Sequence, residues 1–104
     1  MNRYAGSRDH NHEEIADTFR LCGCSVTDTE RTGIAGWPDL VVGCIGVNHL
    51  VEIKNPATHY GRAGLNAQQS SFSRDWRGEK VHKVSTRDEA ITLVQTWRKA
   101  FSHD

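Results

Sequence analysis

The chain has 104 residues and a mass of 11.7 kDa, which is the size of one compact domain and too small for two. Its thirteen Lys and Arg residues equal its thirteen Asp and Glu residues, so the formal net charge of zero lacks the basic excess typical of nucleic-acid-binding proteins. No apolar run approaches the roughly 18 residues of a membrane span, and the first residues are too polar for a signal peptide. We therefore expect a single cytoplasmic domain over 1–104, with a flexible start at 1–10 and no membrane partner.

The cysteines and histidines give no pattern of a structural zinc site. The three cysteines are Cys22, Cys24 and Cys44, and the first two lie one residue too close for the usual zinc knuckle. The six histidines are scattered without an H-x-x-x-H pair. We expect reduced thiols that pack as small buried apolar side chains.

The first predicted element is a helix over residues 12–22. Asn11 can act as its N-cap, and Glu14, three residues later, can bond back to that cap. Gly23 supplies the stop signal. The apolar residues of the segment recur at helical spacing on one face: Ile15, Ala16, Phe19 and Cys22.

Three short strands are predicted next. Residues 24–29 form the first, and a glycine-containing loop at 32–36 separates it from an apolar, β-branched run at 40–45. A turn at 46–48 leads into the third strand at 49–54. The second and third strands therefore form a hairpin.

A second helix is predicted over 66–77, after a loop at 56–64. Asn66 and Gln69 repeat the capping pattern of the first helix. The residues of this region expected to face inward are Leu65, Phe72 and Trp76.

A fourth strand at 80–84 and a final helix complete the chain. Ser85 or Thr86 can cap this helix. Its apolar stripe consists of Ala90, Ile91, Val94, Trp97 and Phe101. The predicted order is αβββαβα, an α/β fold in which helices flank a central mixed sheet.

One group of ionisable residues gathers on the predicted hairpin. Glu52 and Lys54 project from the same face of their strand, since side chains alternate along a strand. This pattern alone is also typical of a half-solvated strand. Asp39, however, stands at the mouth of the preceding strand, and hairpin pairing brings it close to Glu52 and Lys54.

Two adjacent carboxylates repel each other unless a cation lies between them. Mg²⁺, or the similar Mn²⁺, suits Asp39 and Glu52, with the backbone carbonyl of Ile53 as a further ligand. Lys54 beside the metal can orient a water nucleophile or stabilise charge that develops on phosphorus. These are the parts that a phosphodiester hydrolase needs.

The segment Gly36-Trp37-Pro38-Asp39-Leu40, followed by Glu52-Ile53-Lys54, resembles the Pro-Asp…(Asp/Glu)-x-Lys signature of restriction-endonuclease-like nucleases. The order αβββαβ is the common core of that superfamily. Over residues 8–92 the chain further resembles small stand-alone nucleases of the virus-type replication-repair (VRR-NUC) family. The flanking residues that carry this likeness are Asn11, Glu14 and Ile15 before the signature and Leu65, Gln69, Phe72 and Trp76 after it.

The resemblance implies a role for each matching residue. Asp39 and Glu52 would be metal ligands, Lys54 the catalytic lysine, Glu14 a further acid that reaches the metal, and Gln69 a catalytic polar group. Glu13 is the alternative to Glu14, because the register of a single helix is uncertain. Glu14 and Gln69 could instead serve only to close their capping boxes. Where relatives often open the second helix with Thr-Pro, this chain has Asn66-Ala67, which preserves the capping chemistry.

The resemblance also implies a substrate and an assembly. Relatives of this type cut branched or flapped DNA, and the stand-alone forms in bacteria and phage-infected cells resemble Holliday-junction resolvases that act in DNA recombination as homodimers. A dimer supplies the two symmetric active sites that a four-way junction needs. The apolar candidates for its interface are Trp37, Trp97 and Phe101, although the core is the more common place for such residues.

Local charge predicts where DNA binds. The segment from Lys54 to Lys83 contains six basic residues and two acidic ones, which gives it a local net charge of +4. The loop at 56–64 would suit a strand-gripping role. The expected DNA contacts are Arg62, Arg74, Arg77, Lys80 and Lys83, each of which could also be an ordinary solvated side chain.

Two alternatives stay open beside the junction endonuclease. One is a nicking, restriction-type, flap or single-strand nuclease of the same fold. The other is a catalytically silent DNA-binding or regulatory module, against which the intact Asp39, Glu52 and Lys54 argue. Neutral overall charge does not exclude DNA, because a metal would offset Glu14, Asp39 and Glu52 and leave thirteen basic against ten acidic residues.

Overall fold

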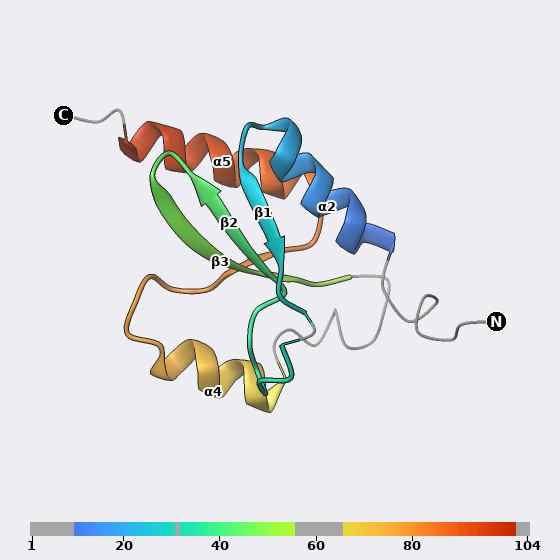
Figure 1. Ribbon diagram of the computed structural model, residues 1–104, viewed down its shortest axis with the longest axis vertical. Coiled ribbons are helices and arrows are strands. Elements are labelled where there is room, and N and C mark those ends of the chain that lie inside the picture. Colours follow the sequence, from blue (N-terminus) through green and yellow to red (C-terminus); the bar gives the residue numbers. More distant parts are fainter. Residues whose placement is uncertain (1–9, 31, 56–65, 102–104) are drawn as a thin grey trace.

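The computed structural model describes residues 10–30, 32–55 and 66–101. These residues form a small α/β protein with a four-stranded mixed sheet and three helices (Figure 1). In chain order the elements are α2 (His10–Leu21), β1 (Ser25–Asp28), β2 (Leu40–Cys44), β3 (Val47–Ile53), α4 (Ala67–Asp75), β4 (His82–Val84) and α5 (Arg87–Phe101). The predicted order of helices and strands is thereby confirmed. None of the described helices is both long and apolar enough to span a membrane.

The first helix begins earlier than predicted, because Asn11 does not cap it. α2 starts at His10, and the Asn11 side-chain amide donates to the carbonyl oxygens of Lys54 (3.1 Å) and Ser85 (3.2 Å). The predicted capping box of Asn11 and Glu14 is therefore wrong. These two carbonyl groups directly follow the neighbouring strands β3 and β4, and they accept the hydrogen bonds of the Asn11 side chain, which therefore does not cap the helix. Asn11 thus ties the first turn of α2 to the end of the sheet.

The end of α2 is as predicted. Gly23 has a φ of +92°, in the left-handed region that favours glycine. Its N–H donates to the carbonyl of Arg20 (2.9 Å), and the N–H of Cys24 donates to that of Phe19 (3.0 Å). This pair of bonds is a Schellman motif, which closes the helix and turns the chain toward β1.

The hairpin of β2 and β3 turns more tightly than predicted. Cys44 pairs with Val47, so only Ile45 and Gly46 form the turn, with φ values of 54° and 78°. Two positive φ angles fit the type I′ turn that matches the twist of a hairpin. The predicted turn at 46–48 is therefore wrong, and β3 begins two residues earlier than the predicted strand at 49–54.

The strands follow the order β1-β2-β3-β4 across the sheet. β1 and β3 each pair antiparallel with β2, whereas β4 pairs parallel with β3. α4 lies in the connection between β3 and β4. β4 is shorter than the predicted strand at 80–84, because it pairs only with residues 51–53 of β3.

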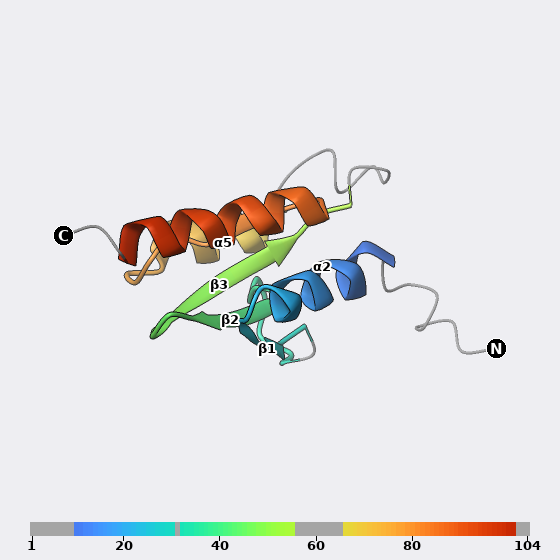
Figure 2. The same cartoon turned by 90° about the horizontal axis from the view of Figure 1, so that it is seen from above.

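Alternation along β3 gives the sheet two different faces. Val51 and Ile53 are buried together with Leu40 and Val42 of β2, and this face is covered by α2 and α5, which run side by side (Figures 1 and 2). Glu52 projects from the opposite face. The sequence thus builds one largely apolar face for the helices, which also carries His49, and one face that carries Glu52.

The apolar core lies between the sheet and the two helices. Phe19 of α2 is fully buried and its ring stacks on Trp97 of α5, with centroids 5.9 Å apart. Burial of each such side chain stabilises the fold by about 1.5–3 kcal/mol. Trp97 is therefore a core residue. Phe101, one turn later, is 68% exposed and lies outside this core.

The cysteines behave as predicted in the described structure. All three carry free thiols, with Cys24 and Cys44 buried and Cys22 half-buried. Burial, reinforced by the neighbouring Cys44, raises the pKa of Cys24 to about 12. Without a metal ion beside it, this thiol stays protonated at neutral pH.

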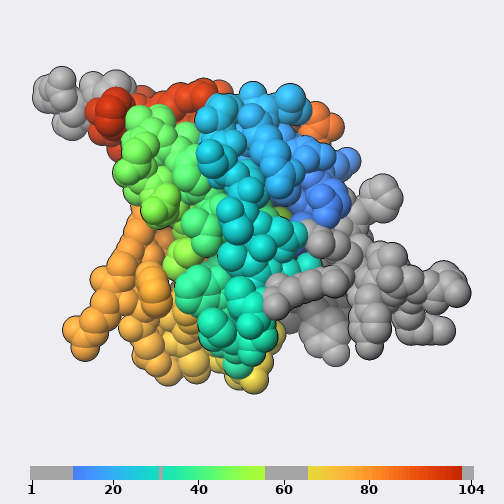
Figure 3. Space-filling model, viewed as in Figure 1, coloured from blue at the N-terminus to red at the C-terminus, as the bar shows by residue number. Residues whose placement is uncertain are grey.

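A second, smaller cluster of aromatic rings attaches α4 to the loop before β2. Trp37 packs edge-on against Phe72 (centroids 5.3 Å apart) and Trp76 (5.9 Å). Gly36 makes this contact possible, because a Cβ on it would collide with the backbone carbonyl of Gln68 in α4, and its φ is +80°. Figure 3 shows this loop, in teal, pressed against the yellow surface of α4. The contact holds α4 beside Asp39.

Candidate functional site

Asp39 directly precedes β2 and lies beside the end of β3. Leu40 pairs with Val51, so the hairpin register sets Asp39 opposite Glu52. Oδ2 of the Asp39 carboxylate accepts a hydrogen bond from the N–H of Ile53 at 2.8 Å. That bond fixes the acid at the mouth of the hairpin, in contact with the neighbouring carboxyl group of Glu52.

Glu52 is a buried acid, not part of a solvated strand. Only 3% of the residue is exposed. Burial raises its pKa to about 8, the negative charge of Asp39 adds to the rise, and Lys54 acts in the opposite direction. Without a further cation nearby, this carboxyl group holds its proton at neutral pH. The pair of acids therefore has the electrostatic character of a cation site.

Lys54 continues the same face one step beyond β3. Its backbone N–H donates to the carbonyl of Val84 (2.9 Å), which anchors it beside β4. Its Nζ lies 3.7 Å from Oε2 of Glu52 and donates to Oε1 of Gln69 at 2.6 Å. Since only 11% of its side chain is exposed, the ammonium group is held inside the cluster.

Gln69 joins α4 to the cluster. The capping box predicted for this helix is confirmed: Asn66 Oδ1 accepts from the Gln69 N–H (2.8 Å), and Gln69 Oε1 accepts from the Asn66 N–H (3.1 Å). The Gln69 Nε2 group also donates to Oε2 of Glu52. One amide thus closes the helix start, restrains the acid and accepts from Lys54.

The helix-one acids do not join this group. Glu14 is exposed and lines a hollow of about 510 Å³ with Ser85, Thr86, Arg87 and Asp88. Within the described part of the chain, no hydrogen bond or ion pair links its side chain to Asp39, Glu52 or Lys54. Glu13 is also exposed on α2. The structure therefore brings together four of the predicted site residues: Asp39, Glu52, Lys54 and Gln69.

The predicted DNA contacts divide between two elements. Arg74 of α4 is exposed and forms an ion pair with Asp75 at 3.0 Å, and Arg77 and Lys80 are exposed beyond that helix. Lys83 of β4 is exposed and is the register partner of Glu52, so it leaves the sheet at the level of the acid pair. Arg62 and the loop at 56–64 lie outside the described residues, as do residues 1–9.

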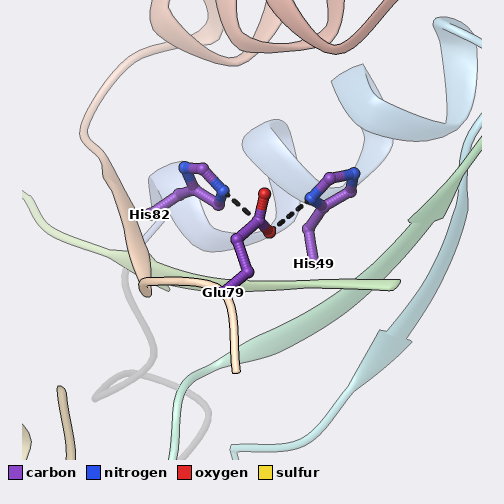
Figure 4. A group of neighbouring side chains, drawn as sticks. All are labelled: His49, Glu79 and His82. Atoms are coloured by element: carbon purple, nitrogen blue, oxygen red, sulfur yellow. Dashed lines mark hydrogen bonds and ion pairs between the residues drawn. The ribbon is translucent and has the colours of Figure 1, made fainter. Parts of the chain in front are cut away.

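Sequence reasoning missed a second cluster, made of His49, Glu79 and His82 (Figure 4). Glu79 and His82 are three residues apart, whereas His49 lies 30 residues before Glu79, so the three do not form one contiguous motif. The signal that could have found them is the register of β3 and β4, which pairs Val51 with His82 and so brings His82 to the same sheet face as His49.

The donor set of the acid cluster suits a hard divalent cation. Asp39 and Glu52 offer carboxylate oxygens, and the carbonyl of Ile53, the residue directly after Glu52, is a further oxygen donor. Burial and the neighbouring Asp39 raise the pKa of Glu52, and a bound cation would oppose both effects. Comparisons of the chain with models of known protein families, with curated proteins and with solved structures find no match.

Proposed function

We propose that this protein is a Mg²⁺- or Mn²⁺-dependent nuclease that hydrolyses phosphodiester bonds in DNA. The observation that carries the proposal is the convergence of Asp39, Glu52, Lys54 and Gln69 from two strands and a helix. Such a group combines acids for a hard metal with a fixed ammonium group. An isolated surface ion pair would be neither buried nor held by a side chain from a helix, as Gln69 of α4 holds this one.

The topology supports the same proposal. The signature residues gather at one end of the hairpin, with Asp39 directly before β2, Glu52 in β3 and Lys54 directly after it, and this arrangement supports a restriction-endonuclease-like core. The four-stranded mixed sheet and the helices before and after the three-strand meander agree with that core. We therefore propose a restriction-endonuclease-like nuclease fold of the VRR-NUC type.

Asp39, Glu52 and the Ile53 carbonyl would hold the metal. When bound, a Mg²⁺ ion supplies a more acidic water and neutralises charge on the phosphoryl group. Glu14 stands apart from these donors in the described structure, so the proposed ligand set does not need it.

Lys54 and Gln69 provide the rest of the chemistry. The ammonium of Lys54 is fixed by its bond to Gln69, so it meets a phosphate without first losing side-chain freedom. It would orient the attacking water and balance the negative charge that grows on phosphorus. Gln69 would hold the side chains of Glu52 and Lys54 in place relative to each other, because its Nε2 donates to Glu52 and its Oε1 accepts from Lys54.

The proposed substrate is branched DNA, cut by a homodimer in the manner of a Holliday-junction resolvase. Exposed Arg77, Lys80 and Lys83 would contact phosphates next to the cluster. Two copies of the chain would supply the paired sites that a four-way junction requires. Exposed Phe101 and Trp76 offer apolar surface for a second copy.

The test is a panel of synthetic DNA substrates with purified protein and Mg²⁺ or Mn²⁺. We expect cutting of a four-way junction, its loss in Lys54→Ala and Asp39→Asn, and retention in Lys99→Ala, a control that removes a lysine from the far end of α5. Asp39→Asn should still bind DNA, since it removes negative charge that faces the phosphates.

The panel also separates the alternatives. Cutting confined to nicked, flapped, duplex or single-stranded DNA would assign a different nuclease of the same fold. Binding of a junction without any cutting by the folded wild-type protein, in either metal, would refute the enzyme and favour a silent DNA-binding module.

A further inference from the structure

Three side chains that could ligate a metal meet on the sheet face opposite the acid cluster. His49 comes from β3, Glu79 from the segment between α4 and β4, and His82 from β4 (Figure 4). Nδ1 of His49 lies 2.7 Å from Oε1 of Glu79, and Nε2 of His82 lies 3.2 Å from the same oxygen. All three donor atoms lie within 4.8 Å of one another.

The two imidazole rings are held by packing. His49 is 3% exposed and stacks flat on Trp97, with centroids 3.6 Å apart and planes 3° from parallel. His82 packs edge-on against the same tryptophan at 5.4 Å and against His49 at 5.6 Å. The nitrogens therefore reach the cluster without further ordering of their side chains, which favours a ligand that bridges them.

The contacts within the cluster leave imidazole nitrogens that could bind a metal without a hydrogen-bond partner. Nε2 of His82 is buried and has no hydrogen bond, although it lies 3.2 Å from the Glu79 oxygen. That separation is close to the spacing of about 3.3 Å between two ligands of a tetrahedral zinc ion with bonds of about 2.0–2.1 Å. The shorter distance from His49 to Glu79 would have to widen by about half an ångström for such bonds. Glu79, with 44% of its side chain exposed and outside any strand, can make that shift.

We propose that His49, Glu79 and His82 form a binding site for Zn²⁺ or a similar transition-metal ion, distinct from the acid cluster. Two imidazole nitrogens and one carboxylate are donors that favour zinc, copper or nickel over Mg²⁺. Strand alternation separates the two sites, because His49 and Glu52 leave β3 on opposite faces.

The geometry also assigns an open fourth position. A hollow of about 270 Å³ borders the cluster, and its walls include His49, Glu79, Trp97 and the exposed side chains of Val47 and Phe101. Three protein ligands with a vacant position are typical of zinc sites that also take a water or an outside ligand. The site would therefore accept a small exogenous donor beside an apolar wall.

One feature lowers the expected affinity. Nε2 of His49 is buried without a partner, so metal at Nδ1 leaves the opposite N–H without an acceptor. Loss of such a supporting bond weakens metal binding by about 10–100-fold. We therefore expect a measurable site of moderate strength.

Titration of the metal-free full-length protein with Co²⁺ tests the site. We expect one equivalent to bind with the strong visible absorption of four-coordinate cobalt, and Zn²⁺ to displace it. His82→Gln and Glu79→Gln should bind Co²⁺ at least about tenfold more weakly. His49 is unsuitable for substitution, because it is packed in the core against Trp97.

Two controls make the result specific. Asp28→Asn removes a carboxylate from the other group that could hold a metal, His12, Asp28 and Glu30, and should leave Co²⁺ binding unchanged. The strong absorption of four-coordinate cobalt should also survive in Glu52→Gln, which alters only the acid cluster, so this readout does not depend on the proposed nuclease site. Equal Co²⁺ affinity in wild type, His82→Gln and Glu79→Gln, or the weak absorption of six-coordinate cobalt, would overturn the proposal. Glu79→Gln changes a partly exposed side chain, so it decides the question if His82→Gln fails to fold.

Discussion

Glu52 shows how a single buried side chain can make the whole protein sensitive to pH. In the metal-free protein its pKa is about 8, against an ordinary value of 4.5, mainly because of burial. Between these two values the folded protein holds a proton that the unfolded chain has released. The free energy of unfolding contributed by Glu52 is therefore fully present below about pH 4.5 and falls as the pH rises through about 8.

This linkage predicts a pH-dependent stability that Glu52→Gln removes. Urea unfolding with a chelator present should show the wild type losing up to about 1.4 kcal/mol per pH unit more than Glu52→Gln in this range. Mg²⁺ should restore wild-type stability at the higher pH, because it replaces the proton. Parallel pH profiles for the two proteins would contradict the raised pKa.

Gln69 joins a local and a long-range role in one side chain, and a pair of variants separates them. Asn66→Ala and Gln69→Ala both break the capping box of α4 and should each lower stability by about 0.5–2 kcal/mol. Only Gln69→Ala also frees Glu52 and Lys54. We expect about a tenfold or greater loss of cutting rate in Gln69→Ala alone, equivalent to at least about 1.4 kcal/mol. Equal loss in both variants would mean that Gln69 acts only through the helix.

At the scale of elements, periodicity in the sequence predicts which segments become helices and strands, whereas tertiary contacts decide where they end. Asn11 reads as a cap, but two carbonyls from other elements claim its side chain. Ile45 is a β-branched residue at positive φ, which local preferences disfavour, so the turn at 45–46 could not be expected from sequence. Long-range contacts outweigh these preferences.

The turn matters for the site because it sets the register. A turn at 46–48 would pair Ile45 with His49 and hence Asp39 with Asn55. The observed turn instead sets Asp39 opposite Glu52. The sequence therefore predicted the convergence of Asp39, Glu52 and Lys54 in general, but not the register that produces it. Nor could spacing reveal that Glu14 stands apart, since helix packing decides where it points.

Two glycines with positive φ give a matched test of how α4 is attached. Gly46→Ala should cost about 1–2 kcal/mol from backbone strain alone, because nothing lies near its added Cβ. Gly36→Ala adds a collision with Gln68 of α4 to a similar strain and should cost more. Thermal unfolding measures both costs. Cutting should fall in folded Gly36→Ala but not in Gly46→Ala, and equal activities would show that α4 docks independently of Gly36.

For the whole molecule, a net charge of zero conceals an uneven distribution. Exposed Lys83 is the register partner of Glu52 and so lies at the level of the acid cluster, whereas Arg74 is partly neutralised by Asp75. An affinity for DNA that rests on phosphate contacts falls with salt, by a slope of about 0.9 in log affinity against log salt concentration for each contact. Composition alone could not predict this, because it averages over faces that only the fold separates.

Lys83→Ala tests this distribution. We expect weaker binding to junction DNA and a decrease of about 0.9 in the slope of log affinity against log salt concentration, as for one lost phosphate contact. Fluorescence anisotropy over a salt series measures both. Lys99→Ala, on α5, should change neither, and an unchanged slope in Lys83→Ala would remove that residue from the DNA path.

The side chains of β3 and of Lys54 directly after it alternate between two faces of the sheet. His49, Val51 and Ile53 lie on one face, and Leu50, Glu52 and Lys54 lie on the other. A single-residue insertion between His49 and Glu52 would therefore move the residues on one side of the insertion to the wrong face, whereas a two-residue insertion would keep every residue on its own face. The strand's tolerance of insertions should thus follow whether their length is odd or even, a constraint on length that acts separately from residue identity.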